Sequence, residues 1–161
     1  MTVYAQYAFL LLALLASALI AGFFYAYSVS VMPGLAATDP LAATHAMRGI
    51  NAVIRTPVFA FSFFGALAFP LVGAFLARRR AVVLLALAGA LVYDLGAFAV
   101  TFAVNVPLND ALGTATLTAE NAAALWRGYA SPWNLWNHVR TLASIVAFAF
   151  LMAAVVVECQ R

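Results

Sequence analysis

A small set of polar side chains interrupts four long apolar stretches, and these are the side chains whose types and spacing could do chemistry. The last stretch carries Asn134, Asn137, His138, Arg140, Thr141 and Ser144 in its first half. At about 100° per residue they cover one broad sector of a helix. His138, beside Asn137 and Arg140, adds a group that titrates near neutral pH. The first stretch adds Tyr25 and Ser28. This sector is either a ligand or reaction site or a polar network that only joins helices.

A carboxylate in the third stretch needs a partner. Asp94 lies near the middle of that stretch, where a charged group costs about 2.5–3.5 kcal/mol in lipid. Asp94, Phe98, Thr101 and Asn105 follow at i, i+4, i+7 and i+11, which places them on one helix face. At about 1.5 Å per residue, the long side chain of Arg140 reaches the depth of Asp94. We therefore predict a buried Asp94–Arg140 ion pair, and destabilisation by Asp94→Asn because Arg140 would be left unpaired.

The composition indicates which solvent surrounds these groups. The 161-residue chain is 67% hydrophobic and 8% charged, and its mean hydropathy is +1.04. A soluble domain carries about a quarter charged residues, so lipid must cover most of this surface. The net charge is +3, but the eight basic residues, all arginine, are too scattered for a phosphate-binding stripe, and we expect no nucleic-acid partner. The absence of lysine and the many alanines suggest a GC-rich bacterial genome. One cysteine, Cys159, leaves no intrachain disulfide and no cysteine metal cluster.

Four stretches have the roughly 20 apolar residues that a membrane-spanning helix needs. They cover residues 4–31, 57–77, 81–104 and 133–157. We therefore expect an all-α fold, a four-helix transmembrane bundle in which residues 1–161 form a single integral membrane domain. The first stretch has no basic segment before it and is too long for a cleaved signal peptide. Arg78, Arg79 and Arg80 occupy the short turn between the second and third stretches, and the positive-inside rule places this turn and both termini on the cytoplasmic side of the cell membrane.

The two longer loops are predicted to contain short amphipathic helices. In the first, Asp39 is an N-cap, Pro40 takes the first helical position, and the helix runs to about Arg55. Its polar stripe is Thr44, Arg48, Asn51 and Arg55, beside the apolar residues Met47, Ile50 and Ile54. In the second loop, Thr118 caps a short helix through Tyr129. An aromatic cluster of Trp126, Tyr129, Trp133 and Trp136 follows, as is common at membrane interfaces.

Three segments carry a resemblance to a known family. They are Asn105-Val106-Pro107-Leu108-Asn109, Trp126-x-x-Tyr129 and Trp133-x-x-Trp136-Asn137-His138-x-Arg140. Together with residues 28–33 and 47–51, these segments resemble the anthrone oxygenase-like family of small four-span membrane proteins over nearly the whole chain. Many members of that family have no assigned function, and its name comes from members that oxidise polycyclic anthrones to anthraquinones.

The resemblance implies oxidation of a lipophilic polycyclic aromatic or quinol-like substrate by dioxygen, without a cofactor or metal. The doubly benzylic CH2 of an anthrone is acidic, and the anion that remains after proton removal is electron-rich enough to react with dioxygen. Such a site needs a base and hydrogen-bond donors for the oxyanion. His138 would be the base, and Arg140, Asn137 and Asn105 the donors. The substrate-binding residues would be Trp126, Tyr129, Trp133, Trp136, Asn109, Thr101, Tyr25 and Ser28.

Other classes of protein remain open at this point. The main alternative is a non-catalytic binding or assembly module whose polar network is structural. A haem or copper protein would have only His45 and His138 as histidine ligands, without ligand-type spacing. A monomeric transporter would be expected to have broken helices. A pocket beside His138 and Asn105 would favour the enzyme, and the sequence leaves the natural substrate and the oligomeric state open.

Overall fold

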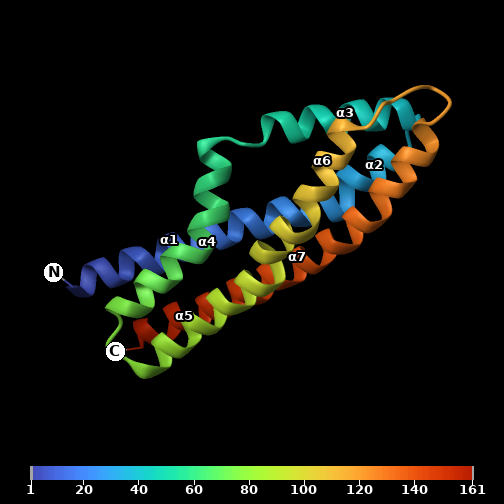
Figure 1. Ribbon diagram of the computed structural model, residues 1–161. Helices are drawn as coiled ribbons and strands as arrows, with labels where there is room; N and C mark the ends of the chain where they lie inside the picture. Colours follow the sequence, from blue (N-terminus) through green and yellow to red (C-terminus); the bar gives the residue numbers. More distant parts are fainter. Residues whose placement is uncertain (1, 161) are drawn as a thin grey trace.

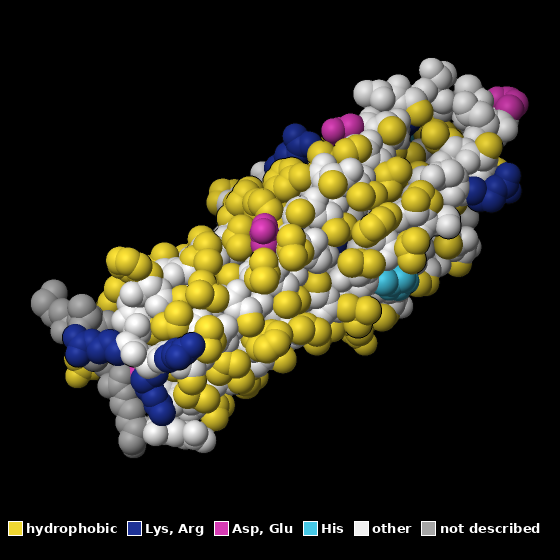
Figure 2. All heavy atoms as spheres, turned by 60° about the horizontal axis from the view of Figure 1, so that its bottom comes forward, with side chains coloured by type: hydrophobic (Ala, Val, Ile, Leu, Met, Phe, Trp, Pro, Cys, Tyr) yellow, Lys and Arg dark blue, Asp and Glu magenta, His cyan; other side chains and the backbone are white. Residues whose placement is uncertain are grey.

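Four long apolar helices form an elongated bundle (Figure 1). The computed structural model describes residues 2–160, with side chains from Tyr4 onward, and this part of the chain contains no strand. Continuous helical stretches that are long and apolar enough to cross a membrane cover Tyr4–Ala36, Pro57–Leu76, Arg80–Thr114 and Ala122–Cys159. Hydrophobic side chains cover much of the outer surface (Figure 2). The chain is therefore a multi-pass integral membrane protein in contact with lipid, as the composition predicts.

The spans are built from the following elements. The first contains α1 (Thr2–Ala26), the π-helical segment η1 (Tyr27–Val31) and α2 (Met32–Ala36). α3 (Pro40–Val53) then leads to the second span, α4 (Pro57–Leu76). The third contains α5 (Arg80–Tyr93), the π-helical segments η2 (Asp94–Phe98) and η3 (Thr101–Asn105), and α6 (Val106–Thr114). The fourth is α7 (Ala122–Cys159).

The fourth span is longer than the sequence suggests. The helix predicted from Thr118 to Tyr129 begins at Ala122 and does not end at Tyr129, because it continues through Pro132 into the span. The 38 residues of α7 extend about 57 Å at 1.5 Å per residue. A hydrocarbon core is about 30 Å thick, so one half of α7 projects beyond it. α3 and α6 pack on this projecting half.

α3 crosses the bundle at the end remote from the turn between α4 and α5 (Figure 1). The predicted N-cap is confirmed, because the Asp39 carboxylate accepts two backbone N–H groups of the first turn at 3.0 and 3.1 Å. Arg48 fastens α3 to the end of the third span by donating to the carbonyl groups of Leu112 at 3.0 Å and Ala115 at 2.6 Å. α3 is therefore held as a strap over the upper part of the bundle.

The helices approach closely below this strap. A Cβ atom at Gly96 would collide with Ala143 of α7, so the absence of a side chain lets η2 and α7 pack backbone to backbone. Nearby, the hydroxyl of Tyr93 donates to the carbonyl oxygen of Phe63 at 2.8 Å and joins the third span to α4. These contacts hold the third span against α7 and α4 on the side of the strap that faces the α4–α5 turn.

The prediction of an ion pair between Asp94 and Arg140 is wrong. Among the described residues, no carboxylate oxygen lies within 4.0 Å of the Arg140 guanidinium. Asp94 begins η2, and a π-helical turn takes one residue more than an α-helical turn, which shifts the helix phase by about 100°. The predicted common face therefore breaks between Asp94 and Thr101. Asn105 is fully buried, whereas Asp94 is only half-buried.

Asp94→Asn is expected to leave the unfolding midpoint unchanged or to raise it. The substitution removes a carboxylate that is costly in lipid and takes no partner from Arg140. Thermal unfolding of both proteins in lipid nanodiscs measures the difference. A fall of several degrees in the midpoint would show that a cation does depend on Asp94.

Candidate active site

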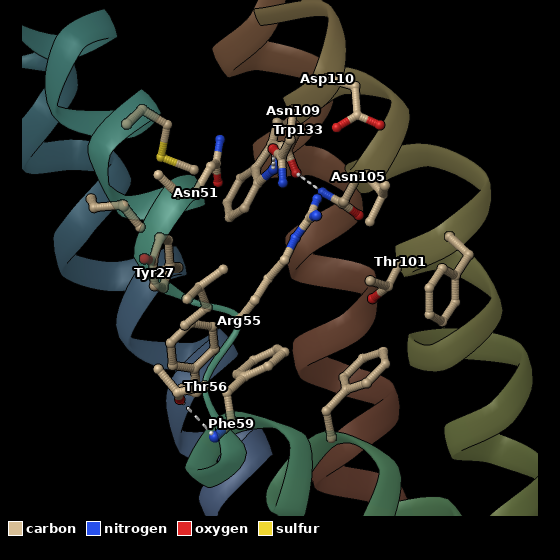
Figure 3. A pocket seen from close by; sticks show the side chains of 18 of the residues that line it. Tyr27, Asn51, Arg55, Thr56, Phe59, Thr101, Asn105, Asn109, Asp110 and Trp133 are labelled. Carbon is tan, nitrogen blue, oxygen red and sulfur yellow. Dashed lines mark hydrogen bonds between the residues drawn. The ribbon is translucent and has the colours of Figure 1, made fainter. Parts of the chain in front are cut away.

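A pocket of about 990 Å³ lies below α3, between the projecting half of α7 and the tops of the other spans (Figure 3). Much of its wall is aromatic, from Phe23, Phe24, Phe59, Phe63, Phe64 and Phe102. Its polar lining includes Arg48, Asn51, Arg55, Thr101, Asn105, Asn109, Asp110 and Arg140. A largely apolar cavity of this size with a few converging polar groups is typical of a site for a small organic ligand.

Arg140 is the most unusual group in this pocket. Its side chain is 5% exposed, although it carries a charge. Nη1 donates to Thr101 Oγ1 at 3.2 Å and Nη2 donates to Asn137 Oδ1 at 2.9 Å, while Nε has no hydrogen-bond partner among the described residues. Buried charges are normally paired with an opposite charge because desolvation costs several kcal/mol. Arg140 therefore brings to the pocket a positive charge that no carboxylate of the described residues neutralises.

Aromatic rings hold the guanidinium in place. The guanidinium carbon of Arg140 lies 4.5 Å from the ring centroid of Phe24 and 5.0 Å from that of Trp133. Cation–π contacts of this kind stabilise a cation without neutralising it. The charge is thus positioned at the pocket wall and remains uncompensated.

Asn137 positions Arg140 from behind. Its amide nitrogen donates to the carbonyl of Phe24 at 2.9 Å and to Ser28 Oγ at 2.8 Å. These two bonds turn the amide oxygen toward Arg140. Ser28 is in turn within 3.2 Å of Thr141 Oγ1. Asn137 therefore supports the guanidinium, and neither it nor Ser28 lines the pocket.

Two asparagines position Trp133. Asn105, which is fully buried, donates from Nδ2 to the carbonyl of Trp133 at 3.2 Å and has no partner for Oδ1. Asn109 Oδ1 accepts from Trp133 Nε1 at 2.8 Å and from the Tyr129 hydroxyl at 2.9 Å. Both asparagines belong to the segment around Pro107, where η3 passes into α6. The segment therefore anchors the third span to α7.

The profile of the anthrone oxygenase family matches residues 56–150, which is more than half of the chain. The chain belongs to the anthrone oxygenase family. The matched region includes α4, the third span and most of α7, and thus Thr101, Asn105 and Arg140. The searches of curated proteins and of solved structures found no match.

In this anthrone oxygenase family member, the structure places some of the predicted site residues in the pocket and others outside it. Arg140, Asn105, Asn109, Thr101 and Trp133 line the pocket. Trp126 and Tyr129 are buried in the packing around Met47 and Leu112 instead. Trp136 and Tyr25 are exposed on the outer surface. Of the four residues of the aromatic cluster, Trp133 is the one that lines this pocket.

His138 lies outside the pocket, which corrects its assignment as a base at this site. Its side chain is exposed and does not belong to the pocket lining. The physical reason is helical phase: His138 follows the buried Asn137 by one residue and is therefore rotated by about 100° from it. The predicted polar sector of α7 is too broad, because Asn137, Arg140, Thr141 and Ser144 are buried whereas His138 is exposed.

The structure adds pocket residues that the sequence argument did not assign. Arg48, Asn51 and Arg55 form most of the predicted polar stripe of α3, but this stripe faces the pocket. Arg55 extends into the pocket, and Asp110 lies at its rim on α6 (Figure 3). Arg48 and Asn51 of α3 and Arg55, which follows the end of α3, belong to the predicted stripe, whereas Asp110 gives no periodic signal. Tyr27 of η1 also lines the pocket.

The polar chemistry at the pocket comes from guanidinium, carboxamide, hydroxyl and carboxylate groups. Within residues 2–160, no group of three or more His, Cys, Asp or Glu side chains is arranged to hold a metal ion. Asp110 is the carboxylate among the lining residues.

Proposed function

We propose that the protein is an oxygenase that uses dioxygen to oxidise a lipophilic anthrone-like or quinol-like compound in this pocket, without a bound cofactor. The observation that carries this proposal is the buried Arg140 guanidinium, which faces an apolar pocket without a carboxylate partner. Membership of the anthrone oxygenase family supports the type of chemistry.

Arg140 fits the charge that develops during such a reaction. Removal of a proton from the CH2 of an anthrone leaves an enolate whose negative charge lies largely on the former carbonyl oxygen. A fixed guanidinium stabilises that oxyanion more strongly in a low-dielectric pocket than in water. The side chain of Thr101 and the amide of Asn137 already hold the guanidinium, so little reorganisation is needed when the charge appears.

The oxygenation needs no external reductant, because the substrate supplies all the electrons that dioxygen accepts. The enolate carbon transfers electrons to dioxygen, a carbon–oxygen bond forms, and protonation gives a hydroperoxide. Loss of water then breaks the oxygen–oxygen bond and the remaining carbon–hydrogen bond and leaves a ketone. One oxygen atom enters the quinone and the other leaves in water. The apolar walls from Phe59, Phe63 and Phe102 suit dissolved dioxygen and a flat substrate.

Asp110 is our candidate for the proton acceptor. It is the carboxylate of the pocket lining and it lies at the rim, where a proton can pass to water. Arg55 lines the same pocket.

The proposal is tested by oxygen uptake and anthraquinone formation in membranes that contain the protein and anthrone. We expect a protein-dependent rate in which one dioxygen is consumed per anthraquinone formed. Matched membranes without the protein give the background oxidation. A rate equal to that background would overturn the proposed function and favour the non-catalytic alternative.

His138→Ala is expected to change this rate by no more than about twofold, as is usual for an exposed side chain. Asp110→Asn should slow it, because the pocket then lacks a carboxylate acceptor. Steady-state rates of both variants at equal protein level make the comparison. Loss of turnover in His138→Ala with normal rates in Asp110→Asn would reverse the assignment of the base.

We further propose that the end with Arg78, Arg79 and Arg80 is cytoplasmic and that the pocket lies toward the outer side of the cell membrane. Arginines gather at this end of the molecule (Figure 2), where α1 begins and α7 ends (Figure 1). Cys159, which is exposed near the end of α7, reports the orientation. A membrane-impermeant maleimide should label Cys159 only after the cells are opened. Labelling in intact cells would reverse the orientation.

A further inference from the structure

One wall of the pocket is formed by side chains that also reach the outer surface of the bundle. Phe64 of α4 and Phe102 of η3 both line the pocket, and each is 50% exposed on the outer surface. α4 packs closely along α5, but it makes few contacts with η3 higher in the bundle. The second and third spans are therefore bridged here by aromatic side chains, with ring centroids of Phe63 and Phe102 and of Phe64 and Phe98 each 5.9 Å apart. We call this side-chain-filled space between the two spans the gap.

This gap lies at the depth of the lipid chains. The part of α7 from Arg140 to Glu158 covers about 27 Å, which is close to the thickness of a hydrocarbon core. With the end of α7 at one face of the membrane, Arg140 lies near the opposite edge of the hydrocarbon. Phe64 lies about 10 Å further along α4 than Pro57, which begins that span. The gap thus faces lipid, and the guanidinium is near the interface.

The pocket itself is polar at the end near the membrane interface and apolar at the end within the hydrocarbon. Arg140, Asn105 and Asn109 lie toward α3 and α6, whereas Phe59 and Phe63 form the part within α4. Its volume of about 990 Å³ is at the upper end of the range of about 300–1,000 Å³ for ligand pockets. A three-ring aromatic compound fills only part of this space.

We propose that the pocket takes its ligand laterally from the bilayer, and that the ligand is a phenol with an apolar chain. Its acidic oxygen lies on Arg140, and the chain leaves between Phe64 and Phe102 into the lipid. The expectation of an acidic oxygen on the ligand rests on the proposed function. The lateral route rests on the gap and its exposed aromatic side chains.

A photoreactive 4-alkylphenol with a diazirine near the end of its chain tests this proposal in nanodiscs of phosphatidylcholine. Irradiation followed by peptide mass spectrometry maps the attached label. We expect the label to concentrate near Phe64 and Phe102, and unlabelled 4-dodecylphenol to reduce it by at least about tenfold at saturation. Dodecane, which lacks the hydroxyl group, should not compete.

Three variants make the test specific. Ala60→Trp places a large ring in the pocket wall and should reduce labelling by a similar factor, whereas Ala68→Trp, an exposed position of α4 outside the pocket, should not. Arg140→Gln should also weaken the competition by 4-dodecylphenol. The competition by 4-dodecylphenol is measured on the wild-type protein, so it tests the lateral site even where a substitution prevents folding.

The result that overturns the inference is label spread evenly over the lipid-facing surface and insensitive to 4-dodecylphenol. This outcome together with normal anthrone oxidation would remove the lateral route and leave the proposed function intact. Conversely, saturable labelling that Ala60→Trp blocks, without any anthrone oxidation, would support the lateral route and contradict the proposed function.

Discussion

Arg140→Met is expected to lower kcat/KM for anthrone oxidation by about 10²–10³-fold, the range found when a preorganised oxyanion donor is removed. Methionine retains much of the volume between Phe24 and Trp133 but carries no charge and no donor. The unfolding midpoint should stay the same or rise, because the variant no longer buries a cation that lacks a carboxylate partner. Oxygen uptake and thermal unfolding in nanodiscs measure the two effects.

Opposite changes in activity and stability distinguish a ligand-binding arginine from a structural one. Arg127→Met is the matched control, because Arg127 is exposed on α7 and does not line the pocket. It should alter neither quantity. A large loss of stability in Arg140→Met with an unchanged kcat/KM for the folded fraction would assign Arg140 to helix packing alone.

Asn109→Leu is expected to lower the free energy of unfolding by about 2–4 kcal/mol, since each unpaired buried donor costs about 1–3 kcal/mol. The single oxygen Asn109 Oδ1 accepts from both Tyr129 and Trp133, so the substitution leaves two aromatic donors without a partner. It also frees the ring of Trp133, which packs on Arg140. Equilibrium unfolding in mixed micelles, followed by circular dichroism, measures the loss.

Asn109→Asp is the matched control for this prediction. Aspartate has nearly the same shape and keeps an oxygen acceptor for both donors, so most of the stability should remain. Equal destabilisation by leucine and aspartate would mean that the amide nitrogen of Asn109, and not its oxygen, carries the interaction.

Much of the fold follows from features that act locally along the chain. The lengths of the apolar stretches predict the four spans, because the thickness of a bilayer sets a minimum helix length. The Asp39-Pro40 pair predicts the start of α3 because an N-cap requires only the next few backbone N–H groups. The upward extension of α7 through Pro132 was not predicted, since proline normally ends a helix.

The pocket could be predicted only in part, because it depends on helix phase and on elements far apart in the sequence. Asn105, Arg140 and Trp133 were found as polar or aromatic groups near one end of two spans. Asp94 was misplaced because η2 and η3 break the regular 3.6-residue period, and no residue type signals a π-helical turn. His138 was misplaced because a sector wide enough to include it spans both the inner and the outer face of α7.

The strap α3 shows a different limit. Arg48, Asn51 and Arg55 formed a clear stripe, and a polar stripe on an amphipathic helix usually faces water. Here the polar side chains line a pocket that α6 and α7 also enclose, and Arg48 donates to the carbonyl oxygen of Leu112 in α6, 64 residues along the chain. Periodicity identifies the face of a helix, but only the packing of distant elements decides what covers it.

The most direct measurement is the absorption spectrum of anthrone bound to the protein in the absence of dioxygen. If Arg140 stabilises the oxyanion, the wild-type protein will accumulate the enolate at a pH where free anthrone stays neutral, and adding dioxygen will discharge its spectrum as anthraquinone appears. Arg140→Met should bind anthrone without the enolate spectrum. An enolate band of equal intensity in wild type and Arg140→Met, or none in either protein at saturating anthrone, would contradict the role assigned to the buried guanidinium.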